Sequence, residues 1–473
     1  MAYKNKTSDS NVNNIIARKV QLIPVGDKEE VSRVYKYLRD GIEAQNKGMN
    51  QYMSALYAAV MMEACKDDRS ELSKLYSRIS SSKLGSAYSE DIVFAKGLPI
   101  GAFKQKVEND FQNAIKKGLL HGETSLPSYR DTNPLLIHVD YVRLRETNPH
   151  RDCGLYHGYE NNDDFLSHLF NPDLEVYIKF ADDITFKIIF GNVKKSYELR
   201  TVFKNIFNGT YSVRGSSIGF KKTKIMLNLS IQLQELKVDR DEKTSVGVDA
   251  GMAIPAYCGL NNNDYVRLAV GFGEDLQRYR TQTQAEIRRK QKGLQFTSGG
   301  HGRKKKLQAL DRFKEYEKNY VSTYNHGVSK KVVDFAVKNN AKYINLECLK
   351  GFDASERALR NWSYYQLQTY IKYKANLNGI TVRYVNPCYT SQVCSCCGHW
   401  EEDQRVSQDT FICKNPECKN HGVKVNADFN ASRNIAKSTL FIDMKNYKAT
   451  YEEIEKLKKQ AREYYNIPET ETE

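Results

Sequence analysis

The segment SVGVDAG at residues 245–251 decides the fold class of this chain. Its first five residues are predicted to form a buried strand, and the next two turn the chain, so that the carboxylate of Asp249 stands at a strand end. Such strand ends are where α/β sheets usually present their functional side chains. A second apolar strand, KYINLE at 342–347, also ends on an acid, Glu347. An ionised side chain at the end of a buried strand is unusual unless it binds something.

From residue 244 onward, strands alternate with helices. Besides the two strands above, the pattern predicts strands at 253–258, 265–270 and 380–386, and helices at about 275–293, 304–339 and 364–378. This alternation predicts a mixed sheet with crossover helices, so the fold class is multidomain α/β.

A third acid, Asp428, opens a predicted helix, VNADFNASRNIA at 425–436. An Asp at a helix start is commonly a cap, so this residue alone has an ordinary structural explanation. The three acids together resemble the arrangement that holds two Mg²⁺ ions in RNase H-like nucleases, where hard oxygen donors hold ions about 4 Å apart for phosphodiester hydrolysis. Arg433 follows about a turn and a half later and is a candidate to reach the scissile phosphate or to hold a carboxylate.

Four cysteines between the last predicted strand and this helix have the spacing of a zinc site. They are Cys394 and Cys397, with two residues between them, and Cys413 and Cys418, with four. Two knuckles of this kind supply the four thiolates that tetrahedral Zn²⁺ requires, and Gly398 and Gly422 stand at predicted turns. Cys396 lies inside the first pair, so a pairing of Cys394 with Cys396 stays open.

The charge of the chain points to a polyanionic partner. The 473 residues include 72 Lys+Arg and 57 Asp+Glu, a formal net charge of +15, and nucleic acid is the first partner to test. Between Leu276 and Lys306 there are ten basic residues and one acid, Glu286. This basic arm, with its loop GGHGRKKK at 299–306, is predicted to contact phosphates through Arg288, Arg289, Lys290, Lys292, Arg303, Lys304, Lys305 and Lys306.

Two other classes of protein are excluded by the same composition. No run approaches the roughly 18 apolar residues of a membrane span, and the first residues lack the apolar core of a signal peptide. We therefore expect a cytoplasmic protein, whose cysteines bind metal or lie in the core rather than form disulfides.

The first half of the chain changes its periodicity once. Apolar residues at helical spacing over 28–122 predict helices, and alternation in segments such as 176–180 and 225–233 predicts antiparallel strands of a small barrel or sandwich. At the other end, residues 441–473 carry six basic and eight acidic residues. Apolar residues at helical spacing there leave two alternatives open, a docked helix or a disordered tail.

Five motifs carry a family resemblance. They are, in chain order, VGVDAG around Asp249, YINLECL around Glu347, NWSYYQLQ at 361–368, YTSQVCSCCG at 389–398 and VNADFNASRNIA at 425–436. They resemble the split RuvC nuclease domain and target-nucleic-acid-binding zinc module of TnpB proteins and their CRISPR descendants. The length, the LPSYR segment at 126–130 and the GGHGR loop are most similar to the miniature type V-F (Cas12f-like) CRISPR effector nucleases.

The resemblance implies a prokaryotic CRISPR RNA-guided DNA endonuclease with one RuvC site. Its partners would be a guide RNA, made of CRISPR RNA with trans-activating RNA, and target double-stranded DNA beside a short flanking motif. A homodimer on one guide and collateral single-stranded DNA cleavage are also implied. In this family Asp249, Glu347 and Asp428 would bind two Mg²⁺ ions, and Cys394, Cys397, Cys413 and Cys418 one structural Zn²⁺.

The same resemblance divides the chain into seven predicted segments. They are a leader with the first wedge strand (1–27), a helical recognition domain (28–125), a β-barrel wedge domain (126–240), the first part of the RuvC domain (241–390), the zinc module (391–423), the final RuvC helix (424–440) and an acidic tail (441–473). Two alternative functions remain: a TnpB-type nuclease guided by a transposon-derived RNA, and a catalytically silent RNA-guided DNA-binding protein.

Overall fold

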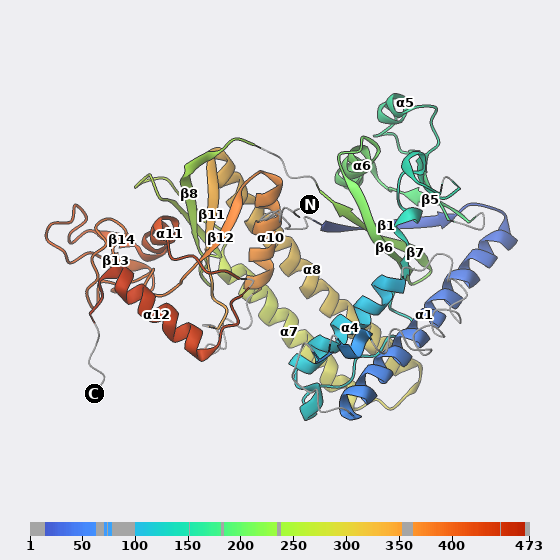
Figure 1. Ribbon diagram of the computed structural model, residues 1–473, viewed down its shortest axis with the longest axis horizontal. Helices are drawn as coiled ribbons and strands as arrows, with labels where there is room; N and C mark the ends of the chain where they lie inside the picture. The colour runs from blue at the N-terminus through green and yellow to red at the C-terminus, as the bar shows by residue number, and fades with distance from the viewer. Residues whose placement is uncertain are drawn as a thin grey trace, which may run out of the picture. The chain divides into compact units, whose positions relative to one another are not determined.

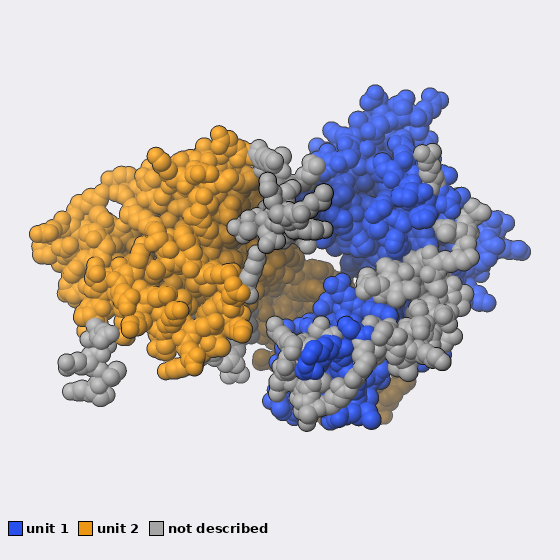
Figure 2. All heavy atoms as spheres, in the orientation of Figure 1, with its two compact units in different colours: residues 1–234 blue, residues 235–473 orange. Residues whose placement is uncertain are grey.

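The computed structural model describes residues 15–62, 71–72, 74–77, 100–150, 152–180, 184–233, 238–351, 363–444 and 446–468. The chain divides into two compact units, Met1–Gln234 and Glu235–Glu473 (Figure 2). Most of the predicted leader and the last five residues of the predicted tail lie outside the described residues. Within the described ranges, no helix combines the length and the apolar character that crossing a membrane requires.

An antiparallel seven-stranded sheet dominates the first unit (Figure 1). Its strands, in spatial order, are β2 (Leu135–Ile137), β6 (Ser212–Lys221), β7 (Lys224–Gln232), β1 (Ile15–Pro24), β5 (Thr185–Ile189), β4 (Val176–Lys179) and β3 (Gly154–His157). The first strand of the chain therefore lies near the middle of the sheet, between β7 and β5. Alternate residues of β7 are buried, as the period-two pattern predicts.

The predicted barrel is not closed. Among the described residues β2 and β3 form opposite edges of the sheet and no ladder joins them. These edge strands have only three and four residues, too few for the continuous staggered pairing that closes a barrel. The edge of β3 is instead met by the segment before it, through a bridge between Leu144 and Leu155.

Helices of the first unit build a core of their own. The long helix α1 (Lys28–Met62) packs against α4 (Ile100–Lys116) through buried residues that include Tyr52, Leu56 and Phe111. The shorter helices are α5 (Asn162–Ser167) and α6 (Val193–Phe207), with 3-10 turns at Leu119–His121, Val139–Tyr141 and Arg145–Thr147. The helical prediction for 28–122 is confirmed over the described residues.

A five-stranded mixed sheet forms the centre of the second unit (Figure 1). Its spatial order is β10 (Arg267–Val270), β9 (Ala256–Leu260), β8 (Asp241–Asp249), β11 (Ala341–Glu347) and β12 (Thr381–Val385). The neighbours β8, β11 and β12 are parallel, whereas β9 and β10 are antiparallel additions. Among the described residues of this unit, the helices are α7 (Gly273–Gln295), α8 (Gly300–Lys338), α10 (Tyr364–Leu377), α11 (Ala427–Lys437) and α12 (Tyr451–Tyr465). The predicted mixed sheet with crossover helices is confirmed.

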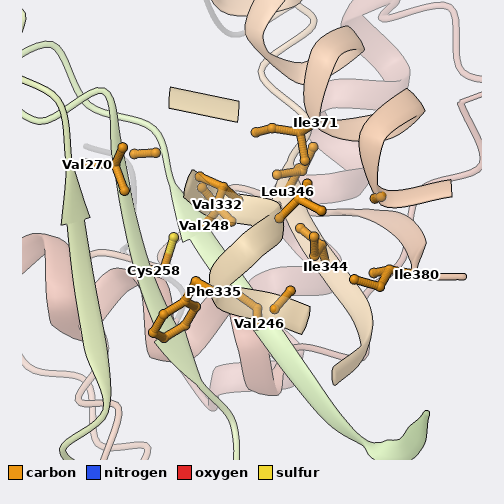
Figure 3. Packing of buried hydrophobic residues seen from close by; sticks show 14 of the residues in the cluster. Val246, Val248, Cys258, Val270, Val332, Phe335, Ile344, Leu346, Ile371 and Ile380 are labelled. Atoms are coloured by element: carbon orange, nitrogen blue, oxygen red, sulfur yellow. The ribbon is translucent and has the colours of Figure 1, made fainter. Parts of the chain in front are cut away.

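The two faces of this sheet are covered by different helices. Val246 and Val248 of β8 belong to a buried cluster with residues of α8 and α10, among them Val332, Phe335 and Ile371 (Figure 3). Burying this apolar face stabilises the unit by about 25 cal/mol for each Å² removed from water.

The opposite face of β8 receives α11, and the alternation within SVGVD explains why. Ser245 Oγ donates a hydrogen bond of 2.6 Å to the carbonyl oxygen of Ala436 in that helix. A Cβ atom on Gly247 would lie 2.0 Å from the carbonyl oxygen of Ser432, so only glycine lets the helix approach this closely. The sequence SVGVD therefore places α11, and with it Asp428, against the strand that ends at Asp249.

Candidate active site and metal centre

Two of the three acids, Asp249 and Glu347, lie side by side at one edge of the sheet. The parallel strands β8 and β11 pair Val248 with Leu346, so the next residue on each strand, Asp249 and Glu347, emerges beside its neighbour. Asp428 is the second residue of α11, the helix that packs against β8. The charges of Glu347 and Asp428 both act on Asp249 and raise its pKa. We call these three residues the carboxylate site.

Burial makes the carboxylate site unfavourable for bare negative charge. Burial is the largest cause that raises the pKa of Asp249 well above its usual range, followed by the charges of the other two acids. It also raises the pKa of Glu347 from 4.5 to about 7 and the pKa of Asp428 above its usual value. Close carboxylates that are removed from water need cations to stay ionised, and their oxygen atoms are the ligands that Mg²⁺ prefers.

The three acids do not form a compact single-ion group. Among the described residues, no group of three or more His, Cys, Asp or Glu side chains that includes these acids has all of its ligand atoms within 4.8 Å of one another, whereas four cysteines do. Two ions about 4 Å apart spread their ligands over a wider space than one ion does. The donor chemistry therefore fits divalent cations of the Mg²⁺ kind.

Glu347 is held by three residues that the sequence analysis quoted only within motifs, without a role. The Thr390 hydroxyl donates a hydrogen bond of 2.7 Å to Glu347 Oε1. The hydroxyl of Tyr364 and the amide of Gln368 both donate to the Glu347 carbonyl oxygen, at 2.6 and 2.8 Å. Tyr364 and Gln368 belong to the NWSYYQLQ motif, whose first two residues lie outside the described part of the chain.

Asp428 is not the cap of its helix. The side chain of Asn426 caps α11 by accepting a hydrogen bond of 2.8 Å from the Phe429 amide. The capping explanation for Asp428 therefore does not hold, and its carboxylate remains available to the carboxylate site.

Arg433 forms an ion pair with a residue outside the carboxylate site. Its side chain is 3% exposed, and Nη2 forms an ion pair with Asp264 in the loop between β9 and β10. The Asp264 carboxylate also forms an ion pair of 2.5 Å with Lys419 Nζ of the cysteine-rich segment. Of the two roles predicted for Arg433, this geometry supports holding a carboxylate, and a catalytic role stays a prediction.

A different arginine stands close to the acids. Arg405, in the loop between the cysteine pairs, has an exposed side chain whose positive charge lowers the pKa of Asp249, Glu347 and Asp428 alike. No motif marked this residue, because it lies 23 positions before Asp428 in an otherwise irregular loop. Only the fold of that loop brings it to the site.

The four predicted cysteines form one cluster. The sulfur atoms of Cys394, Cys397, Cys413 and Cys418 all lie within 4.8 Å of one another, with Cys394 and Cys418 at 3.9 Å and Cys397 and Cys413 at 3.7 Å. Zinc at about 2.3 Å from each sulfur would set tetrahedral ligands about 3.8 Å apart, so the geometry fits Zn²⁺. Cys396 is outside this group, and the pairing of Cys394 with Cys397 is the one that the structure forms.

The knuckles of this cluster use the predicted glycine turns. Gly398 and Gly422 have φ angles of 76° and 68°, and their amides donate to the carbonyl oxygens of Cys394 and Cys413, respectively. The strands β13 (Thr410–Ile412) and β14 (Lys424–Asn426) then pair, and β14 leads directly into α11.

The cysteine-rich segment precedes α11 in the chain and also forms hydrogen bonds with it. Asn430 of α11 accepts from the Ser395 amide at 2.8 Å and donates to the Val393 carbonyl at 2.8 Å. Lys437 Nζ donates to the Ser395 carbonyl at 2.6 Å. The knuckle and the helix that carries Asp428 therefore form one packed body.

The basic arm is a hairpin of α7 and α8, and one part of the prediction for it is wrong. The segment GGHGRKKK is not a loop, because α8 begins at Gly300. Arg303 Nη1 and Lys306 Nζ turn back onto the last turn of α7, donating to the carbonyl oxygens of Leu294 and Gly293 at 3.1 Å each. Arg303 and Lys306 are three residues apart, so a helix places both side chains on the side that faces α7, where both find partners. This favours a helix over a loop at this position.

The other cations of the arm differ in their surroundings. Lys290 lies 4.7 Å over the ring of Phe313, and Arg289 pairs with Glu286. The side chains of Arg288, Lys292, Lys304 and Lys305 are exposed.

Comparison with known proteins places these features in a family. Residues 364–435, which include the cysteine cluster, Thr390, Arg405 and Asp428, match the family described as the TNB domain of Cas12f1-like proteins. A CRISPR-associated endodeoxyribonuclease Cas12f1 of Sulfoacidibacillus thermotolerans is 31% identical over 358 residues, which cover 74% of this chain and 80% of that relative.

The chain belongs to the Cas12f1 family.

A Cas12f1 of Syntrophomonas palmitatica is 36% identical over 232 residues, covering 43% of this chain and 46% of that protein. The cryo-EM structure of a Cas12f1–sgRNA–target DNA complex has a chain with a TM-score of 0.60, at 19% identity, covering 91% of this chain and all of that one. The resemblance to type V-F effectors is thus confirmed, and the multidomain α/β fold is that of a Cas12f1 chain.

Proposed function

We propose that this Cas12f1-family chain is a CRISPR RNA-guided DNA endonuclease that hydrolyses phosphodiester bonds at the carboxylate site. The observation that carries the proposal is the convergence of three acids from β8, β11 and α11 on one edge of the sheet, where the charges of Glu347 and Asp428 raise the pKa of Asp249. Its curated relatives are named endodeoxyribonucleases, which supports the same conclusion.

Asp249, Glu347 and Asp428 would hold two Mg²⁺ ions, which when bound supply an activated water and stabilise the leaving oxygen. The protein's own residues orient this chemistry. Thr390 fixes one oxygen of Glu347, and Arg405 brings positive charge to the place where a phosphate would meet the acids.

The cysteine cluster would hold one structural Zn²⁺. Four thiolates close the coordination shell and leave no position for a substrate, so its role is to fold the module rather than to react. Because this module is bonded to α11, the zinc would stabilise the helix that carries Asp428.

The partners would be a CRISPR guide RNA with its trans-activating RNA and target double-stranded DNA. One Cas12f1 with matching fold was solved with an sgRNA and target DNA. The exposed cations of the α7–α8 hairpin would contact phosphates. A homodimer on one guide and collateral cleavage of single-stranded DNA belong to the proposal as further expectations.

Two measurements test this function. The first is to sequence the RNA that co-purifies with the full chain, where a repeat-derived guide is expected and a transposon-end RNA would indicate a TnpB-type nuclease. The second is cleavage of a matched target by the chain with that guide. Asp249→Asn should abolish cleavage while guide-dependent DNA binding persists, and Asp311→Asn, an exposed acid on α8, serves as the charge-matched control. Cleavage by Asp249→Asn at the wild-type rate would refute the site.

A further inference from the structure

The last helix of the chain has no part in the function proposed above. α12 carries a capping box at Thr450 and Glu453, and Ala461 on its inner side is fully buried. Of the two alternatives for the tail, the structure therefore shows a docked helix over 451–465. Its surroundings show what it docks on.

α12 holds the loop that leaves β12. The Asn386 side chain, 2% exposed, donates a hydrogen bond of 2.7 Å to the Leu457 carbonyl oxygen in the middle of α12. Three residues further along the loop, the Tyr389 hydroxyl accepts a hydrogen bond of 2.9 Å from Arg462 Nε. The helix thus contacts this loop at two points.

The backbone of Tyr389 is in a conformation that needs such support. Its φ of 64° lies in the left-handed region, which residues other than glycine adopt rarely. Contacts around such a residue must hold it in place. Here the contact from Arg462 acts on the side chain, and the amides of Gln392 and Val393 donate to the Tyr389 carbonyl oxygen.

The residue after Tyr389 touches the carboxylate site. Thr390 donates to Glu347 Oε1 at 2.7 Å and is 2% exposed, so it has little freedom to reorient. From the other side, Asn434 of α11 donates to the Thr390 carbonyl oxygen at 2.8 Å. The loop from Asn386 to Thr390 is therefore held between the helix that carries Asp428 and α12, and its end positions Glu347.

We propose that α12 is a positioning element of the carboxylate site, and that Arg462 acts through Tyr389 and Thr390 to hold the Glu347 carboxylate ready for a divalent cation. The inference rests on the proposed function, because it assumes that Glu347 binds the ion. It goes beyond that function by assigning a role to the C-terminal helix.

A second explanation for α12 must be separated from this one. Lys458, Lys459 and Arg462 line one cavity of about 270 Å³ together with Glu455 and Glu463, and the cations there could contact nucleic acid instead. Lys459 is exposed and supplies a charge-matched control on the same helix.

The test measures Mn²⁺ binding to the full chain, purified without RNA, by electron paramagnetic resonance. The Mn²⁺ binding that Asp249→Asn removes is assigned to the carboxylate site. Thr390→Val, which deletes the hydrogen bond to Glu347, should weaken that part about tenfold, as loss of partners that orient metal ligands does. Tyr389→Phe and Arg462→Ala should weaken it in the same direction by a smaller factor, and Arg462→Lys, which keeps a donor, should restore part of it.

Three outcomes are informative. Tyr389→Phe removes one hydroxyl group and keeps the test available if Arg462→Ala does not fold, which thermal unfolding will show. Unchanged Mn²⁺ affinity in both variants overturns the proposal. An equal loss in Lys459→Ala also overturns it, because the effect would then come from charge on α12. If wild type binds no Mn²⁺ that Asp249→Asn removes, the proposed function itself fails, whatever α12 does.

Discussion

Replacing Glu347 with glutamine should stabilise the chain in the absence of Mg²⁺. Burial raises the pKa of Glu347 from 4.5 to about 7, so the folded chain keeps this proton at pH values where the unfolded chain has lost it. The favourable contribution of this retained proton to the free energy of unfolding is complete below pH 4.5. It is lost as the pH rises through about 7. Above that pH the wild-type chain holds a buried charge that Glu347→Gln does not have.

The size of the effect follows from the shift. A change of about 2.5 pKa units corresponds to about 3 kcal/mol at 1.36 kcal/mol per unit, and the side chain is only 8% exposed, so solvent screens little of it. For a unit of 150–250 residues, about 3 kcal/mol raises the melting temperature by about 6–12 °C.

The assay is thermal unfolding of the RNA-free chain in buffer without Mg²⁺ and without chelator, so that the proposed zinc is retained. The melting temperature of Glu347→Gln should exceed that of wild type by a small margin at about pH 5 and by the full amount at about pH 8. Glu242→Gln, an exposed residue of the same strand as Asp249, should show no such trend. Added Mg²⁺ should raise the melting temperature of wild type more than that of the variant.

A difference between Glu347→Gln and wild type that does not grow with pH would refute this reasoning. A variant that is less stable than wild type at about pH 8 would refute it as well, because the buried charge would then not be unfavourable.

Three further predictions concern other parts of the second unit. Arg405→Ala should reduce the cleavage rate about a hundredfold and move the pH profile upward, since its charge lowers the pKa of all three acids; an unchanged profile would place Arg405 outside the site. Cys413→Ser should weaken Mn²⁺ binding at the carboxylate site as well as zinc content, because the module is bonded to α11; loss of zinc alone would show two independent sites. Lys305→Ala should weaken DNA binding and lower the salt slope of that binding by about 1. Arg303→Ala should in addition lower the melting temperature, because Arg303 caps the end of α7. Identical melting temperatures of the two variants would contradict the capping role.

Several features of the fold and site could be predicted from local pattern. The strand ends at Asp249 and Glu347 follow from short apolar runs that stop on an acid, and the cysteine spacing specifies its cluster because ligand pairs in knuckles are local in sequence. The basic arm shows the limit of such patterns. A run of glycines and lysines suggests a loop, but Arg303 and Lys306 have partners on α7 that only the folded hairpin brings within reach.

The barrel prediction was wrong for a related reason. Alternation shows that a strand has one buried face, but it does not show which strands pair or whether the two edges meet. The edges of the first sheet are strands of three and four residues, and the segment around Leu144 occupies the edge where closure would occur.

The sequence by itself determined the identities of the acids and the cysteines, because these groups lie at strand ends and in knuckles whose geometry is local. Tertiary structure alone decided which groups hold and balance them. Thr390 donates to Glu347, and α12 contacts Tyr389, through hydrogen bonds between segments far apart in the chain. The charge of Arg405 acts on all three acids from a separate loop. Such contacts depend on how helices pack against a sheet, and a single sequence contains no spacing rule for them.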